Sequence, residues 1–376
     1  MRKYLIILYV ILWATTTSAQ TVSDLCASQA IAARTADFAP GGLILTYFDG
    51  AALWVYDIDR STRYPLPETV PCVSNCRLSP DGQWITYLNP QTQGYMKMRL
   101  DGTQRTPIMD SAADVLWEAN GNLLVWTPDH RAFVQPEGGT FDQRVYLPAQ
   151  DAVSIMGTWA IHVSNTDQGF MRYLVSLFLS NQTGFTFTPL PLTEDAPYFN
   201  AASWSPNGLY LAFVQRGQAD SQGNRGAELA VVSLATPIVN VLTNFSATQA
   251  VRIDGASPSS LVWSPDSSKV AYWVLPMNNP DPAAVTGQAV LHITDVLSGQ
   301  TTRYCGFSTI EHTPNPPHLV WSPDGSHVAF GGNVEGDGRG YLLLVANVAT
   351  GQFTELSDGI FPALGAPDVL AWGYRP

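Results

Sequence analysis

Residues 321–330 read WSPDGSHVAF, and this sequence indicates the fold because the chain repeats it. Residues 204–213 read WSPNGLYLAF, and residues 263–272 read WSPDSSKVAY. A fourth copy at 78–87, LSPDGQWITY, has leucine in place of the first tryptophan. Repetition of this kind is typical of solenoids, propellers and other repeat architectures.

The residue types in the repeat predict a tight turn between two strands. Ser, Pro, Asp and Gly stand at four consecutive positions, and proline at the second, with its fixed φ, favours a type I turn. The apolar and aromatic residues that follow predict a buried strand. The tryptophan before the turn ends the preceding strand, where its ring can fill the space between neighbouring sheets.

Weaker copies of the pattern lie at 38–42, 117–121 and 157–161. Each copy is followed by a second apolar run, a polar turn and a further short run, which together predict one four-stranded blade. We therefore expect an all-β fold, a β-propeller of seven four-stranded blades. Six or eight blades are the alternatives, because the unit near 157–161 matches the repeat poorly.

The last residues carry one more first strand. Residues 368–372 read DVLAW, with tryptophan at the expected place, and the sequence ends at Pro376. We expect this strand to close the ring onto the N-terminal blade, since closure removes the free edges of an open sheet.

The four good turns resemble those of the TolB-like, WD-repeat-like β-propeller family, whose hallmark is a W-S-P-D-G turn between the first and second strands of each blade. The resemblance covers residues 36–376. It implies the fold but no single activity, because the family is functionally broad. TolB-type proteins carry a separate domain before the propeller, whereas only residues 20–35 precede the repeats here, so that role is not implied.

The N-terminus predicts a signal peptide over residues 1–19. Arg2 and Lys3 precede an apolar run at 4–14, and Thr17-Ser18-Ala19 fits a cleavage site. The apolar run falls short of the roughly 20 residues needed to span a bilayer. We expect a secreted or periplasmic protein without a transmembrane span after cleavage, made of an N-terminal segment at 20–35 and one propeller domain at 36–376.

Four cysteines remain after cleavage: Cys26, Cys72, Cys76 and Cys305. An even number in an exported chain favours two disulfides, for which three connectivities are open. We favour Cys72 with Cys76, which closes a short loop, and Cys26 with Cys305, which ties the N-terminal segment to a distant blade. A zinc site would need further ligands nearby.

Charge and composition narrow the classes of partner. The chain has 31 acidic and 19 basic residues and a formal net charge of −12, and its basic residues are scattered singly. Such a surface has no cationic stripe to neutralise phosphates. We expect no nucleic-acid partner, no cofactor and a monomer.

The sequence shows no constellation typical of an enzyme. It contains neither a G-x-S-x-G elbow nor an H-E-x-x-H helix motif. His292 and His327 fall inside predicted strands and His162 ends one, so packed side chains are the favoured interpretation. His312 and His318 lie in a loop that we expect to be solvated. We therefore predict no catalytic residue, no metal ligand and no enzymatic activity.

The later blades carry long insertions of two kinds. Residues 216–227, 275–287 and 331–340 join second to third strands, while 243–257 and 306–318 join a fourth strand to the next first strand. Both kinds of loop open on the same face of an up-and-down blade, and we call these five segments the enlarged-loop face. Loops on a rigid scaffold often carry binding residues. The polar and aromatic candidates are Arg216, Asn224, Arg225, Arg252, Asn278, Asn279, Asp281, Phe307, His312 and Arg339.

The favoured hypothesis is a non-catalytic scaffold that binds a protein or glycan through the enlarged-loop face. The alternative for these loops is that they are tolerated surface insertions. The alternative function is a propeller enzyme that acts on a sugar or lactone in the central funnel. A purely structural module of a larger envelope assembly is a third hypothesis.

Overall fold

The computed structural model describes a set of segments that covers most of the chain after residue 37. These are residues 22–26, 38–48, 52–66, 76–89, 91–118, 121–128, 131–136, 139–146, 152–156, 159–166, 169–176, 201–236, 238–253, 260–276, 288–310, 318–334, 342–357 and 368–375. The predicted signal peptide at 1–19 lies outside them.

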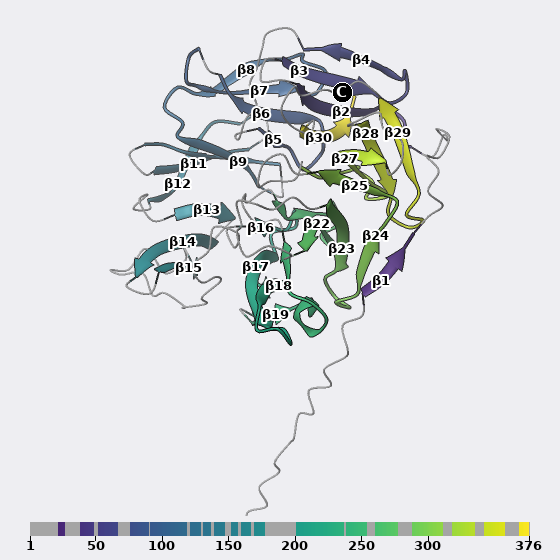
Figure 1. The fold of residues 1–376 in the computed structure, drawn as a ribbon. Helices are drawn as coiled ribbons and strands as arrows, with labels where there is room; N and C mark the ends of the chain where they lie inside the picture. The colour runs from purple at the N-terminus through teal and green to yellow at the C-terminus, as the bar shows by residue number, and fades with distance from the viewer. Residues whose placement is uncertain are drawn as a thin grey trace, which may run out of the picture.

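Antiparallel sheets follow one another around a ring in chain order (Figure 1). Blade one contains β30 (Asp368–Tyr374), β2 (Gly42–Phe48), β3 (Ala52–Asp57) and β4 (Thr62–Pro65). Blade two contains β5 (Arg77–Leu78), β6 (Trp84–Leu88), β7 (Tyr95–Arg99) and β8 (Thr106–Met109). Blade three contains β9 (Asp114–Trp117), β10 (Leu123–Trp126), β11 (Arg131–Gln135) and β12 (Asp142–Tyr146). Blade four contains β13 (Ala152–Met156), β14 (Trp159–Thr166) and β15 (Gly169–Ser176).

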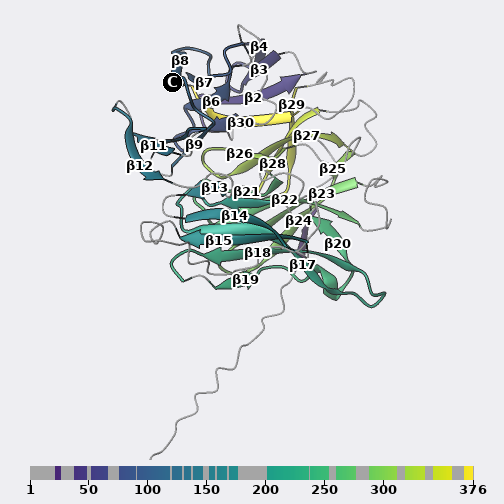
Figure 2. The same cartoon turned by 90° about the vertical axis from the view of Figure 1, so that its left-hand side faces the viewer.

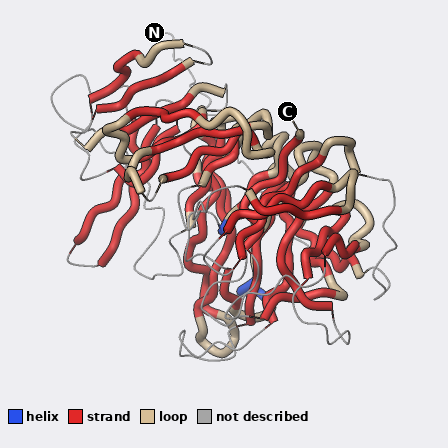
Figure 3. Tube along the Cα trace, turned by 90° about the horizontal axis from the view of Figure 1, so that it is seen from above, coloured by secondary structure: helices blue, strands red, loops and turns tan. Residues whose placement is uncertain are grey.

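Three further blades complete the ring. Blade five contains β16 (Ala202–Trp204), β17 (Tyr210–Ala219), β18 (Arg225–Ser233) and β19 (Val239–Val241). In blade six, β20 (Val251–Ile253) and β21 (Val262–Trp263) both pair with β22 (Lys269–Pro276), followed by β23 (Gln288–Asp295) and β24 (Thr301–Tyr304). Blade seven contains β26 (Val320–Trp321), β27 (His327–Val334), β28 (Leu342–Asn347) and β29 (Phe353–Ser357). The predicted β-propeller is confirmed. The described strands group into seven blades, of which blades six and seven are joined through β25 (Phe307–Ile310) into one 11-stranded sheet, and strands dominate the regular structure (Figure 3).

The repeated turn has the predicted geometry. In blade seven, Gly325 N donates to Ser322 O at 2.9 Å, and Gly325 has the positive φ of 70° that glycine tolerates. Ser322 Oγ donates to Asp324 Oδ1 at 2.5 Å and accepts from His327 N at 2.9 Å. The hydroxyl therefore joins the turn to the start of the second strand. The same acceptor role is played by Ser79, Ser205 and Ser264.

The motif tryptophans Trp263 and Trp321 connect blades six and seven to the blade before each. Trp263 Nε1 donates to Ser203 O at 2.8 Å, and Trp321 Nε1 donates to Val262 O at 2.9 Å. Both acceptors lie one residue before the tryptophan position of their own blade. Tryptophan thus packs an aromatic ring between the blades and also donates to a neighbouring carbonyl. Phenylalanine has no donor, which explains why it does not replace tryptophan in the best copies.

Removing only the indole N–H should therefore weaken the contact between blades six and seven. We expect Trp321→Phe to lower the free energy of unfolding by about 1 to 2 kcal/mol, because the carbonyl of the half-buried Val262 loses its donor. Trp126→Phe is the control, since that half-buried indole donates no hydrogen bond within the described part of the chain. Chemical denaturation measures both, and an equal loss in the two variants would contradict the bridging role.

The two ends of the domain share blade one, as predicted. β30 pairs antiparallel with β2, with Leu43 opposite Gly373 and Ile44 opposite Trp372. Beyond β30, Arg375 Nη2 lies 2.7 Å from Asp57 Oδ2, whose side chain is only 1% exposed. A charge-assisted hydrogen bond to a buried carboxylate thus fastens the closing strand to β3.

We expect Arg375→Ala to cost about 2 to 3 kcal/mol of unfolding free energy, because it leaves the buried Asp57 carboxylate poorly paired. Arg60→Gln is the matched control. Its guanidinium also reaches Asp57, at 3.5 Å, but its side chain is 67% exposed, so a loss below about 1 kcal/mol is expected. Thermal unfolding of both variants tests the role of the Arg375–Asp57 ion pair. A smaller loss of unfolding free energy for Arg375→Ala than for the control would contradict that role.

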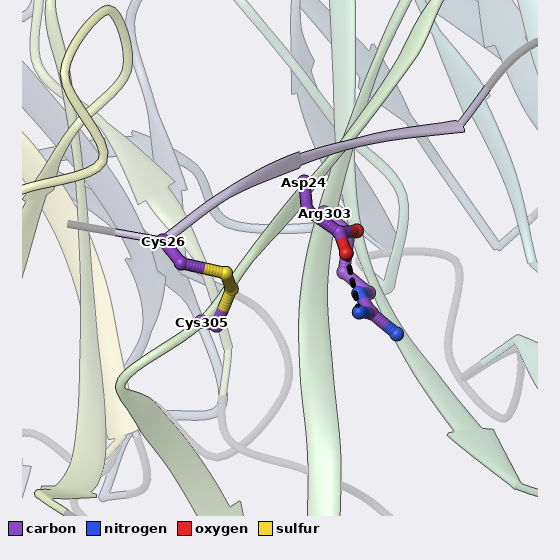
Figure 4. The surroundings of a disulfide bond; sticks show 4 residues. All are labelled: Asp24, Cys26, Arg303 and Cys305. Atoms are coloured by element: carbon purple, nitrogen blue, oxygen red, sulfur yellow. Dashed lines mark hydrogen bonds and ion pairs between the residues drawn. A yellow bond between two sulfur atoms is a disulfide. The ribbon is translucent and has the colours of Figure 1, made fainter.

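A short N-terminal strand adds to the outer edge of blade six. β1 (Val22–Leu25) runs parallel to β24, and a disulfide joins Cys26 to Cys305 directly after the two strands (Figure 4). Asp24 and Arg303 form an ion pair of 2.7 Å beside it. The favoured Cys26–Cys305 pairing is therefore confirmed, and it indicates an extracytoplasmic compartment. Cys76 is also disulfide-bonded, while its expected partner Cys72 lies outside the described residues, so that pairing stays a prediction.

Candidate functional site

A buried carboxylate organises the part of the enlarged-loop face that belongs to blade five. Glu228 is 4% exposed and lies on β18. Its oxygens accept from Thr243 Oγ1 at 2.6 Å, Phe245 N at 2.9 Å, Ser246 N at 2.9 Å and Ser246 Oγ at 2.8 Å. Satisfied lone pairs make burial of the charge tolerable. The connection after β19 is thereby held against the β17–β18 hairpin.

A second contact joins the same two loops nearer the hairpin tip. Asp220 Oδ1 accepts from Asn224 N at 2.8 Å, and Asp220 Oδ2 accepts from Ala250 N at 3.2 Å. A Cβ on Gly226 would lie 2.5 Å from Val251 N, so the close approach of the loops requires glycine there. β18 thus contacts β20 (Figure 2), and the two kinds of insertion lie together in this blade.

The structure places five of the ten candidate binding residues. Asn224 and Arg225 are exposed at the start of β18, and Arg216 is exposed on β17. Arg252 is only 7% exposed on β20, so it offers little surface to a partner. Phe307 begins β25 (Phe307–Ile310), which pairs with β23 and β27. The remaining candidates lie outside the described residues: Asn278, Asn279, Asp281, His312 and Arg339.

Glu228→Ala should release the loop after β19. Losing a buried carboxylate that accepts several hydrogen bonds is expected to cost about 3 kcal/mol of unfolding free energy. Hydrogen exchange of residues 243–250 should also accelerate, whereas Gln218→Ala, an exposed change in the same hairpin, should alter neither. Unchanged exchange in the Glu228 variant would contradict the anchoring role.

His292 and His327 are packed side chains, whereas His318 is half-buried. His292 is 4% exposed, stacks on Tyr272 and meets Phe245 edge-on. Burial lowers the pKa of His292 to about 4, despite a contact of 3.0 Å between Nδ1 and Val290 O. His327 is 5% exposed. His162 lies in β14, and His312 lies outside the described residues.

This burial predicts an acid-sensitive fold. The folded pKa of about 4 lies below the ordinary 6.5, so the neutral form contributes stability above pH 6.5 that is lost as the pH falls towards 4. The loss from this group is on the order of 3 kcal/mol. His292→Phe should remove that part of the pH dependence. Unfolding free energies of both proteins between pH 7 and pH 4 measure it, and parallel curves would contradict the assignment.

A pocket of about 360 Å³ opens between blades two and three. Its lining residues are Ser79, Pro80, Asp81, Trp84, Lys97, Trp117, Gly121, Leu123, Gln135 and Pro136. These come from the turns between first and second strands, from the ends of those strands next to the turns, and from the third strands and Pro136 after one of them. The pocket therefore lies on the face opposite the enlarged-loop face. The sequence-based candidates did not include it. The available signal was the tryptophan that opens the second strand of one repeat, Trp84, together with the motif tryptophan of the next repeat, Trp117.

The described segments hold neither a metal cluster nor a membrane-spanning helix. They contain no group of three or more His, Cys, Asp or Glu residues placed to hold a metal ion. Among them, no helix has the length and apolar character needed to cross a membrane.

The ring of sheets closed by both ends of the domain defines a β-propeller. No protein-family model matches the chain, and no curated protein matches it. The fold is similar to TolB from Acinetobacter baumannii, with 14% identity over 88% of this chain and 82% of that chain and a TM-score of 0.41. Apo AztD from Citrobacter koseri has 11% identity over 89% and 98% of the two chains and a TM-score of 0.43.

A peptidase is also among the similar structures. Porphyromonas gingivalis dipeptidyl peptidase 4 has 12% identity over 77% of this chain, with a TM-score of 0.43, and the chain spans 47% of its length. At such identities the likeness concerns the fold alone. The W-S-P-D-G turns predict membership of the TolB-like repeat family. The structure is similar to TolB in fold, and no sequence relative assigns the chain to the repeat family.

Proposed function

We propose that this chain is an exported, non-catalytic β-propeller scaffold that binds a protein or glycan through the enlarged-loop face. The observation that carries the proposal is the anchored hairpin of blade five. Glu228 and Asp220 hold it to the neighbouring connection, while Asn224 and Arg225 remain exposed at its tip. A rigid loop loses little conformational entropy on binding, which favours affinity.

The compartment in this proposal follows from the chemistry of the cysteines. The Cys26–Cys305 disulfide joins residues 279 positions apart and is suited to an oxidising environment. A signal peptide at residues 1–19 would deliver the chain to the cell exterior or the periplasm. Partner binding outside the cytoplasm is consistent with both.

The binding face is tested with the double variant Asn224→Ala, Arg225→Ala. The parent protein is immobilised, and its binding to a glycan array and to a library of exported proteins is measured. We expect the variant to bind the parent's ligands at least tenfold more weakly, because aligned polar contacts are lost. Lys269→Gln, on the opposite face, is the control. Ligands bound equally by parent and double variant would place the binding surface elsewhere.

A further inference from the structure

Corresponding positions in successive blades place two rings between neighbouring sheets. One ring belongs to the residue that opens the second strand, and the other to the motif tryptophan of the next blade. Between blades five and six these are Tyr210 and Trp263, which stack with centroids 6.2 Å apart and planes 22° apart. Between blades seven and one they are His327 and Trp372, at 6.4 Å. Between blades two and three they are Trp84 and Trp117.

What lies between the two rings differs from one interface to the next. The ring of Phe38 packs against those of His327 and Trp372, with centroids 4.9 Å and 6.1 Å apart. The space enclosed by these residues has no room for a water molecule. Trp84 and Trp117, in contrast, make no ring contact with each other within the described part of the chain, and they line the 360 Å³ pocket. An apolar group thus fills one interface, while the corresponding interface between blades two and three is open.

The two tryptophans of the open interface are held in place. Trp117 Nε1 donates to Arg77 O at 3.1 Å, which fixes its ring as one wall. Arg99 lies 4.0 Å and Lys97 5.3 Å from the ring centroid of Trp84, so cation–π contacts orient the other wall. Preformed aromatic walls lower the entropic cost of binding a flat apolar surface.

The polar groups of the pocket define what such a ligand must carry. Lys97 has no ion pair within the described residues, so its ammonium can pair with an anion. Asp81 Oδ1 is engaged by Ser79 Oγ and Gln83 N, which leaves the other carboxylate oxygen as an acceptor. Gln135 donates from Nε2 to Gly139 O at 3.0 Å and has an amide oxygen to accept with. One cation and two acceptors suit a ligand with a carboxylate and several hydroxyls.

We propose that this pocket binds one acidic sugar residue, a hexuronate, of a glycan. The apolar C–H surface of the pyranose lies against Trp84 and Trp117, the carboxylate pairs with Lys97, and hydroxyls donate to Asp81 and Gln135. The chain's formal charge of −12 disfavours long polyanions, so a single terminal acidic residue fits better than a uniformly charged polymer. The site lies on the face opposite the enlarged-loop face and is independent of the function proposed there.

Calorimetric titration with disaccharides that end in glucuronate or galacturonate tests the proposal. Each acid is compared with its neutral methyl ester, which keeps the rings and removes the charge. We expect at least one acid to bind, and its ester to bind at least tenfold more weakly, since a charge-assisted contact is lost. Binding should also weaken as salt rises.

Variants assign the binding to the pocket. Lys97→Gln should weaken the acid at least tenfold without affecting the ester, and Trp84→Leu should weaken both. Lys269→Gln is the control, because it makes the same charge change outside the pocket. Lys269 opens the second strand of blade six, as Trp84 does in blade two, and its variant should leave binding unchanged. The double variant Asn224→Ala, Arg225→Ala should also leave binding unchanged.

Three outcomes would overturn the proposal: no binding of either acid, equal binding of acid and ester, or equal effects of Lys97→Gln and Lys269→Gln. Tighter binding of an acidic peptide than of either sugar would assign the pocket to a protein ligand instead. Circular dichroism and unfolding midpoints of the variants distinguish loss of the site from loss of the fold.

Discussion

Pairing of β30 with β2 is the constraint on which the rest of this ring depends. Blade one receives its first strand from the end of the domain, so the sheet is complete only when residues 368–374 return to residues 42–48. The backbone groups of two free edges are satisfied in one step. Arg375 then reaches the buried Asp57 carboxylate and fastens the strand. Stability of every blade is thereby coupled to a contact between distant parts of the sequence.

The repeated motif links neighbouring blades, and one of its positions varies from blade to blade. Each serine-proline turn is internally hydrogen-bonded, and motif tryptophans donate to the backbone of the preceding blade. The residue that opens the second strand is free to vary, as Tyr210, Lys269, His327 and Trp84 show. The contents of the interfaces differ accordingly: Tyr210 stacks on Trp263, Phe38 packs against His327 and Trp372, and Trp84 and Trp117 line an open pocket. Function can therefore differ between interfaces of one regular scaffold.

The sequence predicts the parts of the fold that depend on local chemistry. The turn residues, the seven units, the closing strand at Trp372 and the Cys26–Cys305 pairing follow from short motifs and from spacing. The parallel strand β1, the additional strand β20 and the pairing of β25 with both β23 and β27 do not, because they lack repeat character and depend on neighbours distant in sequence. Burial of Arg252 has the same origin, since β20 joins a sheet where a loop was expected. The pocket at Trp84 depends on what occupies the space between two blades, which no single repeat encodes.

Native-state hydrogen exchange measures whether the ring depends on its closing strand. If closure holds the ring together, amides of residues 368–374 and 42–48 exchange together and only through global opening, since each strand protects the other. Exchange of residues 368–374 that is orders of magnitude faster than that of residues 42–48 would show that the ring is stable without its closing strand, and would contradict the account.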